Sequence, residues 1–279
     1  AGVHDMGIYT VDSVEWGGTP DTITVKAKSA DMKGSLKSGR TQSYHDKKLG
    51  EIAKEVATRH ELELAMTDYL MSIEVGHIDQ TDESDLHLLT RLCWQFGAVV
   101  NVKHGKLLIF QPYENKTVSG QPLTLTVLKR DKGDQFRFSI EDRQGDVDNV
   151  QATYHDAKQA KKVTVNTDKE GKKPKRLKGN FKDEKTATAA ANAEKKRIEG
   201  EQGKFSINCA FGYPAISTES PIELQGFKPE IDSLKWTVDK ATHSYSKSQG
   251  LTTQLDLTAP INGEFGAKLE DKKASETAI

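Results

Sequence analysis

The stretch GHIDQTDESDLHLLTRLCWQFG, residues 76–97, predicts a helix that begins near Thr81. Asp82 and Glu83 would occupy its first turn, where acidic side chains interact favourably with the positive end of the helix dipole. Gly97 supplies a natural stop after the last turn. The apolar residues recur with helical spacing and would form one buried stripe: Leu86, Leu89, Cys93 and Phe96.

A second helix is expected upstream of this stretch, with Asp46 as its N-cap. Its apolar residues recur at i, i+3, i+4, i+7 and i+8 and would form another buried stripe: Leu49, Ile52, Ala53, Val56 and Ala57. Downstream, residues 99–102 and 106–110 predict two strands that a His-Gly turn joins as a hairpin. Residues 43–111 are therefore expected to form a small α+β domain.

The beginning of the sequence predicts another pair of strands. Residues 8–16 form the first strand, residues 17–21 are dense in turn formers, and residues 22–28 alternate apolar and polar side chains. This alternation would place three apolar residues on one buried face: Ile23, Val25 and Ala27. Because two strands are not stable by themselves, they must join strands from later in the chain or from sequence that precedes Ala1.

From residue 123 onward the sequence predicts mostly strands, interrupted by an Ala-rich helix from about Asp183 to Ile198. The polar and charged tail at 262–279 is expected to be mobile. The strand candidates are rich in β-branched and aromatic residues: 150–154, 205–209, 234–238 and 252–257.

The segment from Lys158 to Lys182 holds ten Lys or Arg residues against two acidic ones. A solvated hairpin with its turn near residues 168–171 is the favoured interpretation. The alternative is a basic finger that reaches an acidic neighbour or DNA inside a tube. The contact residues of such a finger would be Lys161, Lys162, Lys172, Lys173, Lys175 and Arg176.

Composition limits the classes of protein. A chain of 279 residues suggests two or three domains, and 35% hydrophobic with 29% charged residues is a globular balance without a membrane-spanning stretch. The net charge of -1 gives no support for a nucleic-acid partner. Cys93 and Cys209 are expected to be buried free thiols, and the first six residues show no signal peptide, so synthesis in the cytoplasm is expected.

Short catalytic motifs are missing from the sequence, which holds no phosphate-binding glycine loop, no nucleophile elbow, no zinc helix and no C-x-x-C pair. One crowded segment has side chains of the kinds that ligate metals: His77, Asp79, Glu83 and Asp85. A helix N-terminus is the favoured explanation of its acidic residues, because acidic side chains cap and stabilise that end.

Two further pairs suggest chemistry, and both have simpler explanations. Cys93 near His87 could be a nucleophile, but its place on an apolar stripe indicates a buried and inert thiol. His45 and Asp46 could be an acid/base pair, yet Asp46 is already explained as a helix cap. The tryptophans are interpreted as core anchors instead of a sugar-binding platform: Trp16, Trp94 and Trp236.

Three segments carry a family resemblance. Residues 8–21 with 27–31, residues 76–92, and the chain from Gly226 to Thr253 resemble, in this order, the motifs of the phage late control gene D family. Leu88 stands where an aromatic residue is common in that family. The residues that match its motifs are expected to have structural roles: Asp79, Gln80, Glu83, Ser84, Asp85, Arg91, Gly226, Phe227, Trp236, His243, Thr252 and Thr253.

The resemblance implies a mainly β, α+β fold with two tube-type β-barrels and a small inserted α+β domain. Residues 1–42 would be a partial first barrel whose N-terminal part is missing, and residues 43–111 the inserted domain. Residues 112–261 would be the second barrel, including the basic hairpin and the Ala-rich helix, followed by the tail 262–279.

The implied function is that of the baseplate hub of a contractile phage tail, related to the T-even central hub and the N-terminal region of the type VI secretion spike VgrG. Three copies would form a ring in the virion baseplate that contacts the tail tube protein, a trimeric spike and other baseplate proteins. The resemblance implies no enzyme activity, catalytic residue, cofactor, metal or membrane insertion, and it does not predict a DNA contact. Alternatives that remain open are a tail-tip cell-wall hydrolase, a carbohydrate-binding module and a type VI secretion spike base.

Overall fold

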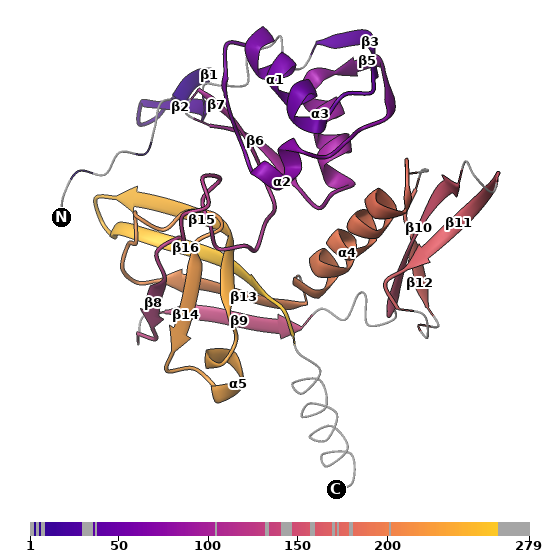
Figure 1. Cartoon of the computed structure of the whole chain (residues 1–279). Helices are drawn as coiled ribbons and strands as arrows, with labels where there is room; N and C mark the ends of the chain where they lie inside the picture. Colours follow the sequence, from indigo (N-terminus) through magenta and orange to yellow (C-terminus); the bar gives the residue numbers. More distant parts are fainter. Residues whose placement is uncertain are drawn as a thin grey trace, which may run out of the picture. The chain divides into compact units, whose positions relative to one another are not determined.

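A computed structural model describes residues 9–29, 38–103, 105–131, 134–140, 147–156, 160–168, 173–178, 181–200 and 202–261, with the single residues 3, 6, 36 and 171. The predicted tail at 262–279 lies outside the described residues. The chain is mainly β and divides into two compact units, Ala1–Gln111 with Val118–Gly120 and Pro112–Thr117 with Gln121–Ile279 (Figure 1). Within the described part of the chain, every helix is too short or too polar to cross a membrane.

The first unit contains the predicted α+β fold. Strands β3 and β5 pair antiparallel and form a two-stranded ribbon. A second sheet has the order β4-β7-β6, in which β4 is parallel and β6 antiparallel to β7. The β6–β7 pair is the hairpin that the sequence predicts. The elements are β3 Gly39–His45, α1 Leu49–Arg59, β4 Glu63–Met66, α2 Asp68–Met71, β5 His77–Ser84, α3 Asp85–Trp94, β6 Val99–Lys103 and β7 Lys106–Phe110.

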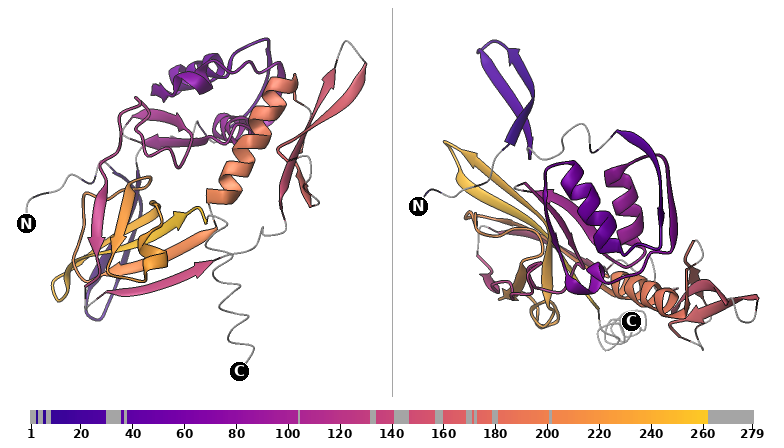
Figure 2. Two further views of the ribbon diagram at one scale, coloured as in Figure 1. Left: turned by 60° about the horizontal axis from the view of Figure 1, so that its bottom comes forward. Right: turned by 45° about the horizontal axis from the view of Figure 1, so that its top comes forward.

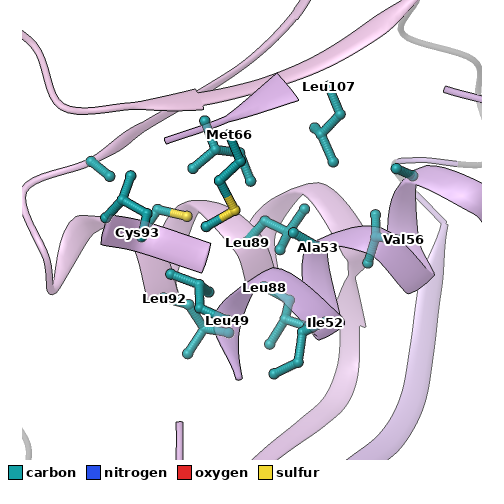
Figure 3. Packing of buried hydrophobic residues seen from close by; sticks show 14 of the residues in the cluster. Leu49, Ile52, Ala53, Val56, Met66, Leu88, Leu89, Leu92, Cys93 and Leu107 are labelled. Atoms are coloured by element: carbon teal, nitrogen blue, oxygen red, sulfur yellow. The ribbon is translucent and has the colours of Figure 1, made fainter. Parts of the chain in front are cut away.

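The core of this unit lies where α1 and α3 meet the β4-β7-β6 sheet (Figure 3). Met66 and Leu107 contribute from the strands, and Cys93 contributes from α3. All five residues of the stripe predicted for α1 are buried, which confirms the helical spacing of the sequence. Leu86, predicted for the stripe of α3, is half-buried, while Leu88 and Leu92 are fully buried.

Both helix starts predicted for this unit are wrong. Residues 77–84 form β5 because they pair with β3, so α3 begins at Asp85 and not near Thr81. Ser84 is the N-cap, and its hydroxyl accepts a hydrogen bond from the backbone N–H of His87 at 3.2 Å. Asp46 lies in a turn with a φ of 48°, and Lys48 takes the N-cap position of α1.

The first unit also holds the predicted N-terminal hairpin, β1 Tyr9–Gly17 and β2 Thr22–Ser29 (Figure 2). Among the described residues these strands pair with each other alone. Ile23 and Val25 do share one face, but they are exposed by 68% and 55%. The prediction of a buried face is therefore wrong for the chain as described, since a two-stranded ribbon has no second layer to cover it.

The second unit is built on a curled six-stranded sheet with the order β8-β14-β15-β16-β13-β9. Its strands are antiparallel except for the β8–β14 pair. One face is covered by a core in which Phe205, Trp236 and Leu255 are buried. The elements are β8 Thr126–Lys129, β9 Gln135–Ile140, β13 Gly203–Cys209, β14 Pro221–Gln225, α5 Pro229–Asp232, β15 Trp236–Ser246 and β16 Gly250–Ala259.

A separate three-stranded sheet in this unit packs against the Ala-rich helix, as Figures 1 and 2 show. The helix buries small residues against β10, which allows the close approach of its backbone: Ala187, Ala190 and Ala191. The elements are β10 Asn149–Asp156, β11 Lys161–Asn166, β12 Pro174–Arg176 and α4 Glu184–Gly200.

The basic segment does not form the predicted hairpin. β11 and β12 lie on opposite sides of β10, with β11 antiparallel and β12 parallel to it. The antiparallel pair is β10–β11, so the chain reverses between Asp156 and Lys161 and not near residues 168–171. The β10–β11 pairing joins neighbouring segments of the chain, whereas the β10–β12 pairing joins segments that β11 separates in sequence.

Candidate functional site

Asp85, from the quoted stretch, is the centre of a buried polar network in the first unit. Its Oδ2 lies 2.7 Å from Nη1 of Arg59 and 2.8 Å from Nε2 of His60, and the residue is 2% exposed. Its Oδ1 accepts a hydrogen bond from Nε2 of Gln80 at 2.9 Å. The carboxylate therefore ties the end of α1 to the junction of β5 and α3.

Gln80 and Glu83 complete this junction. Nε2 of Gln80 also donates to the backbone oxygen of Glu83 at 2.7 Å, which fixes the chain just before α3. Arg91 binds the Glu83 carboxylate with two hydrogen bonds, Nε to Oε1 at 2.9 Å and Nη2 to Oε2 at 2.7 Å. These bonds lower the pKa of the Glu83 carboxyl, so it stays ionised and paired. Arg91 further donates to the backbone oxygen of Asp79 at 3.2 Å.

Sequence reasoning missed Arg59 and His60, which are the partners of Asp85. Arg59 stands out in the sequence only as a basic residue at the end of a predicted helix, where it would interact with the helix dipole. The pairing needs the tertiary contact between α1 and α3. No local spacing in the sequence could have indicated it.

The residues of the third matched segment form a second network, in the second unit. Trp236 is 1% exposed, and its Nε1 donates to the backbone oxygen of Ile231 at 3.0 Å. Asp232 accepts hydrogen bonds from the backbone N–H groups of Gly226 at 3.0 Å and Phe227 at 3.2 Å. Gly226 has a φ of 89°, a conformation that favours glycine.

His243 connects the loop that contains Ile216 to the six-stranded sheet of this unit through hydrogen bonds. Its Nε2 donates to the backbone oxygen of Ile216 at 3.1 Å, and its Nδ1 accepts from the Thr253 hydroxyl at 3.0 Å. Oγ1 of Thr253 accepts in turn from the backbone N–H of Tyr213 at 2.8 Å. Thr252 lies next to it on β16 with its hydroxyl 3.5 Å from the backbone oxygen of Ser244. His243 therefore has both ring nitrogens engaged in holding the fold.

The predicted basic contact residues do not gather on one strand. Lys161 and Lys162 are exposed on β11, whereas Lys175 and Arg176 lie on β12 at the opposite edge of the sheet. Nζ of Lys175 lies 2.7 Å from Oε1 of Glu194, and Nε of Arg176 donates to Oε1 of Gln151 at 3.1 Å. Lys173 is exposed just before β12, and Lys172 is outside the described residues.

The candidate reactive groups are engaged or inert. Burial raises the pKa of the Cys93 thiol to about 12, and burial with a smaller contribution from Asp134 does the same for Cys209. Both thiols therefore stay protonated and are poor nucleophiles. Of the tryptophans, Trp236 is a core anchor as predicted, but Trp16 and Trp94 are exposed by 77% and 55%, so that interpretation is wrong for them.

The four candidate metal ligands of the quoted stretch do not form one group in the structure, although His77 and Asp79 are in contact. His77 and Asp79 lie on the exposed face of β5, whereas Glu83 is paired with Arg91 and Asp85 is buried. Throughout the described ranges, no group of three or more His, Cys, Asp or Glu residues is placed to hold a metal ion. The capping explanation is also wrong for Glu83, because it belongs to β5 and precedes the N-cap Ser84.

Comparison with known proteins identifies relatives along nearly the whole chain. Residues 6–249 match the family described as phage tail baseplate hub (GPD). A probable baseplate hub protein of Escherichia phage P2 is 36% identical over 295 residues, which cover 92% of this chain and 76% of the relative. The corresponding protein of Escherichia phage 186 is 33% identical over 309 residues, covering 96% of this chain and 79% of the relative.

Solved structures share the fold at low sequence identity. A tail protein from Neisseria meningitidis MC58 has a TM-score of 0.63 at 13% identity and covers 90% of this chain and 79% of its own. The 43 kDa tail protein of prophage MuSo2 from Shewanella oneidensis has a TM-score of 0.61 at 17% identity and covers 88% and 76%. At these identities the likeness concerns the fold alone.

Proposed function

This chain belongs to the phage tail baseplate hub family, and from that premise we propose that three copies of it form a ring that joins the tail tube to the spike. As a hub it is a structural part of the baseplate of a contractile tail. Its partners in this proposal are two further copies of itself, the tail tube protein, a trimeric spike and neighbouring baseplate proteins.

The observation that carries the proposal is the apolar face of the β1–β2 hairpin. Trp16 lies opposite Ile23, and Val14 lies opposite Val25. A bulge between Val11 and Ser13 shifts the register, so that Val11 lies opposite Ala27 and the face stays apolar along its length. Trp16 is 77% exposed on this face. Large apolar side chains that cluster on a surface usually mark an interface.

The other face of the hairpin is polar and suits solvent. Nζ of Lys26 lies 2.7 Å from Oε1 of Glu15, and Nζ of Lys28 lies 2.5 Å from Oδ2 of Asp12. Thr24 lies opposite Glu15 on the same side. A ribbon with one apolar and one charged face has the pattern of a sheet that packs on a partner through a single side.

A closed ring is the assembly that such a face supports. When a surface of one copy binds a different surface of the next copy, rotation closes the contacts into a ring. A ring of three identical copies offers every contact three times, as a junction with a trimeric spike requires. The hairpin face is the surface that we assign to the contact between copies.

We infer that the role is structural and not catalytic. The thiols have a raised pKa, and the carboxylates of Glu83 and Asp85 are held in ion pairs. A depression of about 420 Å³ lies on the six-stranded sheet, and the charges of the side chains that line it cancel. Two of these side chains are basic and two are acidic: Arg137, Lys204, Asp239 and Asp256. In both networks the ionisable side chains are engaged in hydrogen bonds or ion pairs.

Replacing Trp16 by Lys together with Ile23 by Glu is expected to abolish the association of copies. These positions lie opposite each other, so the new charges can pair and preserve the hairpin while the apolar face is lost. Light scattering after size exclusion should give three times the chain mass of 30.8 kDa for the wild type and a single chain mass for the variant.

The matched control carries Thr10→Glu opposite Lys28 and Thr24→Lys opposite Glu15, on the polar face. It adds the same two charges and should remain trimeric. If the Trp16→Lys/Ile23→Glu variant is still trimeric, the hairpin face is not part of the interface between copies. A monomeric wild type over the whole concentration range would contradict the ring.

A further inference from the structure

A pair of histidines faces solvent on the β3–β5 ribbon of the first unit. His45 and His77 are directly opposite each other across the two strands. Their Nδ1 atoms lie 2.9 Å apart, and the ring centroids are separated by 4.4 Å. Tyr44 and Ile78, the next pair of the ribbon, point to the opposite face, and Tyr44 is buried in the core. The backbone that carries the histidines is therefore held firmly while their rings stay accessible.

Asp79 orients one of the two rings. Its Oδ2 lies 3.0 Å from Nε2 of His77, so the carboxylate accepts the ring N–H at that position. Ser43 donates its hydroxyl to Oδ1 of Asp79 at 2.6 Å. The bonds from Ser43 and His77 fix the position of the Asp79 carboxylate beside the His77 ring. With its proton at Nε2, neutral His77 presents the lone pair of Nδ1 toward His45.

This arrangement has the features of a metal site. A ligating histidine commonly donates its other ring N–H to a carboxylate, which fixes the tautomer and raises the basicity of the ligand. Two nitrogens bound to one tetrahedral zinc ion at about 2.0–2.1 Å lie roughly 3.3 Å apart. The distance of 2.9 Å between the Nδ1 atoms is close to that separation, so a small outward movement of the exposed rings would admit an ion.

We propose that His45 and His77 bind one divalent transition-metal ion of the kind that prefers imidazole, such as Zn²⁺ or Ni²⁺. Both histidines ligate through Nδ1, and Asp79 is a positioning residue that holds His77. The proton of His45 moves to its Nε2, which the exposed ring allows. Water completes the coordination, because the two histidines supply only two of the ligands.

Two other described histidines of this unit, His60 and His87, are engaged with carboxylates. His60 is buried against Asp85, with 2.8 Å between Nε2 and Oδ2. Nδ1 of His87 lies 2.9 Å from Oε1 of Glu83, on α3. The imidazoles of the pair on β3 and β5 are therefore distinct from those bound to Asp85 and Glu83.

Isothermal titration of the chain, free of any polyhistidine tag, with Zn²⁺ and with Ni²⁺ tests the proposal. One ion per chain is expected to bind. Asp79→Asn should weaken binding by about 10- to 100-fold, since it removes only the orienting partner. His45→Ala and His77→Ala each remove a ligand and should weaken binding more than Asp79→Asn does. His155→Ala is the matched control, because it removes an exposed histidine of another sheet and should leave the affinity unchanged.

Nitrogen NMR of the histidine rings provides a second readout. Zn²⁺ should shift the Nδ1 resonances of His45 and His77 and leave those of His60 and His243 in place. Absence of binding to the wild type would overturn the proposal and leave a hydrogen-bonded histidine pair. Binding that survives both alanine variants would overturn it as well, by placing the ion elsewhere. Far-UV circular dichroism establishes that each variant is folded.

Discussion

Replacing Asp85 with alanine is expected to lower the free energy of unfolding of the first unit by about 3–5 kcal/mol. The change removes the carboxylate that pairs with Arg59 and with the buried His60. Gln80 also loses an acceptor. Breaking one side of a buried ion pair costs more than the pair contributes, because the remaining charge stays desolvated.

Urea denaturation followed by far-UV circular dichroism measures this loss. Asp79→Ala is the matched control, because it removes a carboxylate whose side chain is 54% exposed, from β5, the strand that leads into α3. That control should lose less than about 1 kcal/mol. Equal losses in the two variants would contradict the role assigned to the buried network.

The same network gives the stability a defined dependence on pH. Burial alone would raise the pKa of the Asp85 carboxyl, but hydrogen bonds from Gln80, Arg59 and His60 hold it below its ordinary value. Its contribution is therefore complete above the unfolded-state pKa of about 3.9 and is lost as the pH falls through the lower folded-state pKa. The difference in stability between the wild type and Asp85→Asn should accordingly shrink below about pH 4.

Trp236→Ala is expected to destabilise the second unit by about 3–5 kcal/mol. The ring is fully buried, with its centroid 5.5 Å from that of Phe205 and 6.2 Å from that of Phe138. The variant leaves a cavity and also removes the hydrogen bond to the backbone oxygen of Ile231. Trp236→Phe keeps most of the volume and loses the hydrogen bond, so its loss should be smaller, about 1–3 kcal/mol.

Chemical denaturation of these variants is compared with that of Trp94→Ala. Trp94 is 55% exposed at the end of α3, so this control should change stability by less than about 1 kcal/mol. A Trp236→Ala variant as stable as the control would contradict the anchoring role of the ring.

Periodicity in the sequence predicts the elements that a regular spacing of apolar residues or a turn between two short strands defines. The stripe of α1 from Leu49 to Ala57 and the β6–β7 hairpin follow from spacing and turn residues alone. The Ala-rich helix was predicted with its small residues, although its packing on β10 required the structure. Three strands of the six-stranded sheet, β13, β15 and β16, overlap predicted strands, whereas β8, β9 and β14 were not predicted individually. The order of the strands depends on contacts between distant segments.

Tertiary pairing overrode local preference at two places. Asp82 and Glu83 have the composition of a helix start, yet pairing with β3 keeps them in β5 until Ser84 caps α3. The basic strands β11 and β12 were predicted to pair with each other, whereas both pair with β10. In the first case the deciding partner, β3, is remote in sequence. In the second case β10 directly precedes β11, and only its pairing with β12 joins segments that another strand separates.

The matched residues could be identified from the sequence, but their physical roles could not. Asp85 was interpreted as a helix-end residue and is the centre of a buried ion network with Arg59 and His60. His243 holds a loop through both ring nitrogens. These contacts show how Asp85 in the first unit and His243 in the second hold the fold together.

Electron microscopy of the purified wild-type chain in negative stain tests the central claim most directly. The hub proposal predicts class averages of closed rings with threefold symmetry, formed by three copies through the hairpin faces. Particles of single-chain size at every concentration, or open filaments, would contradict a closed trimeric hub.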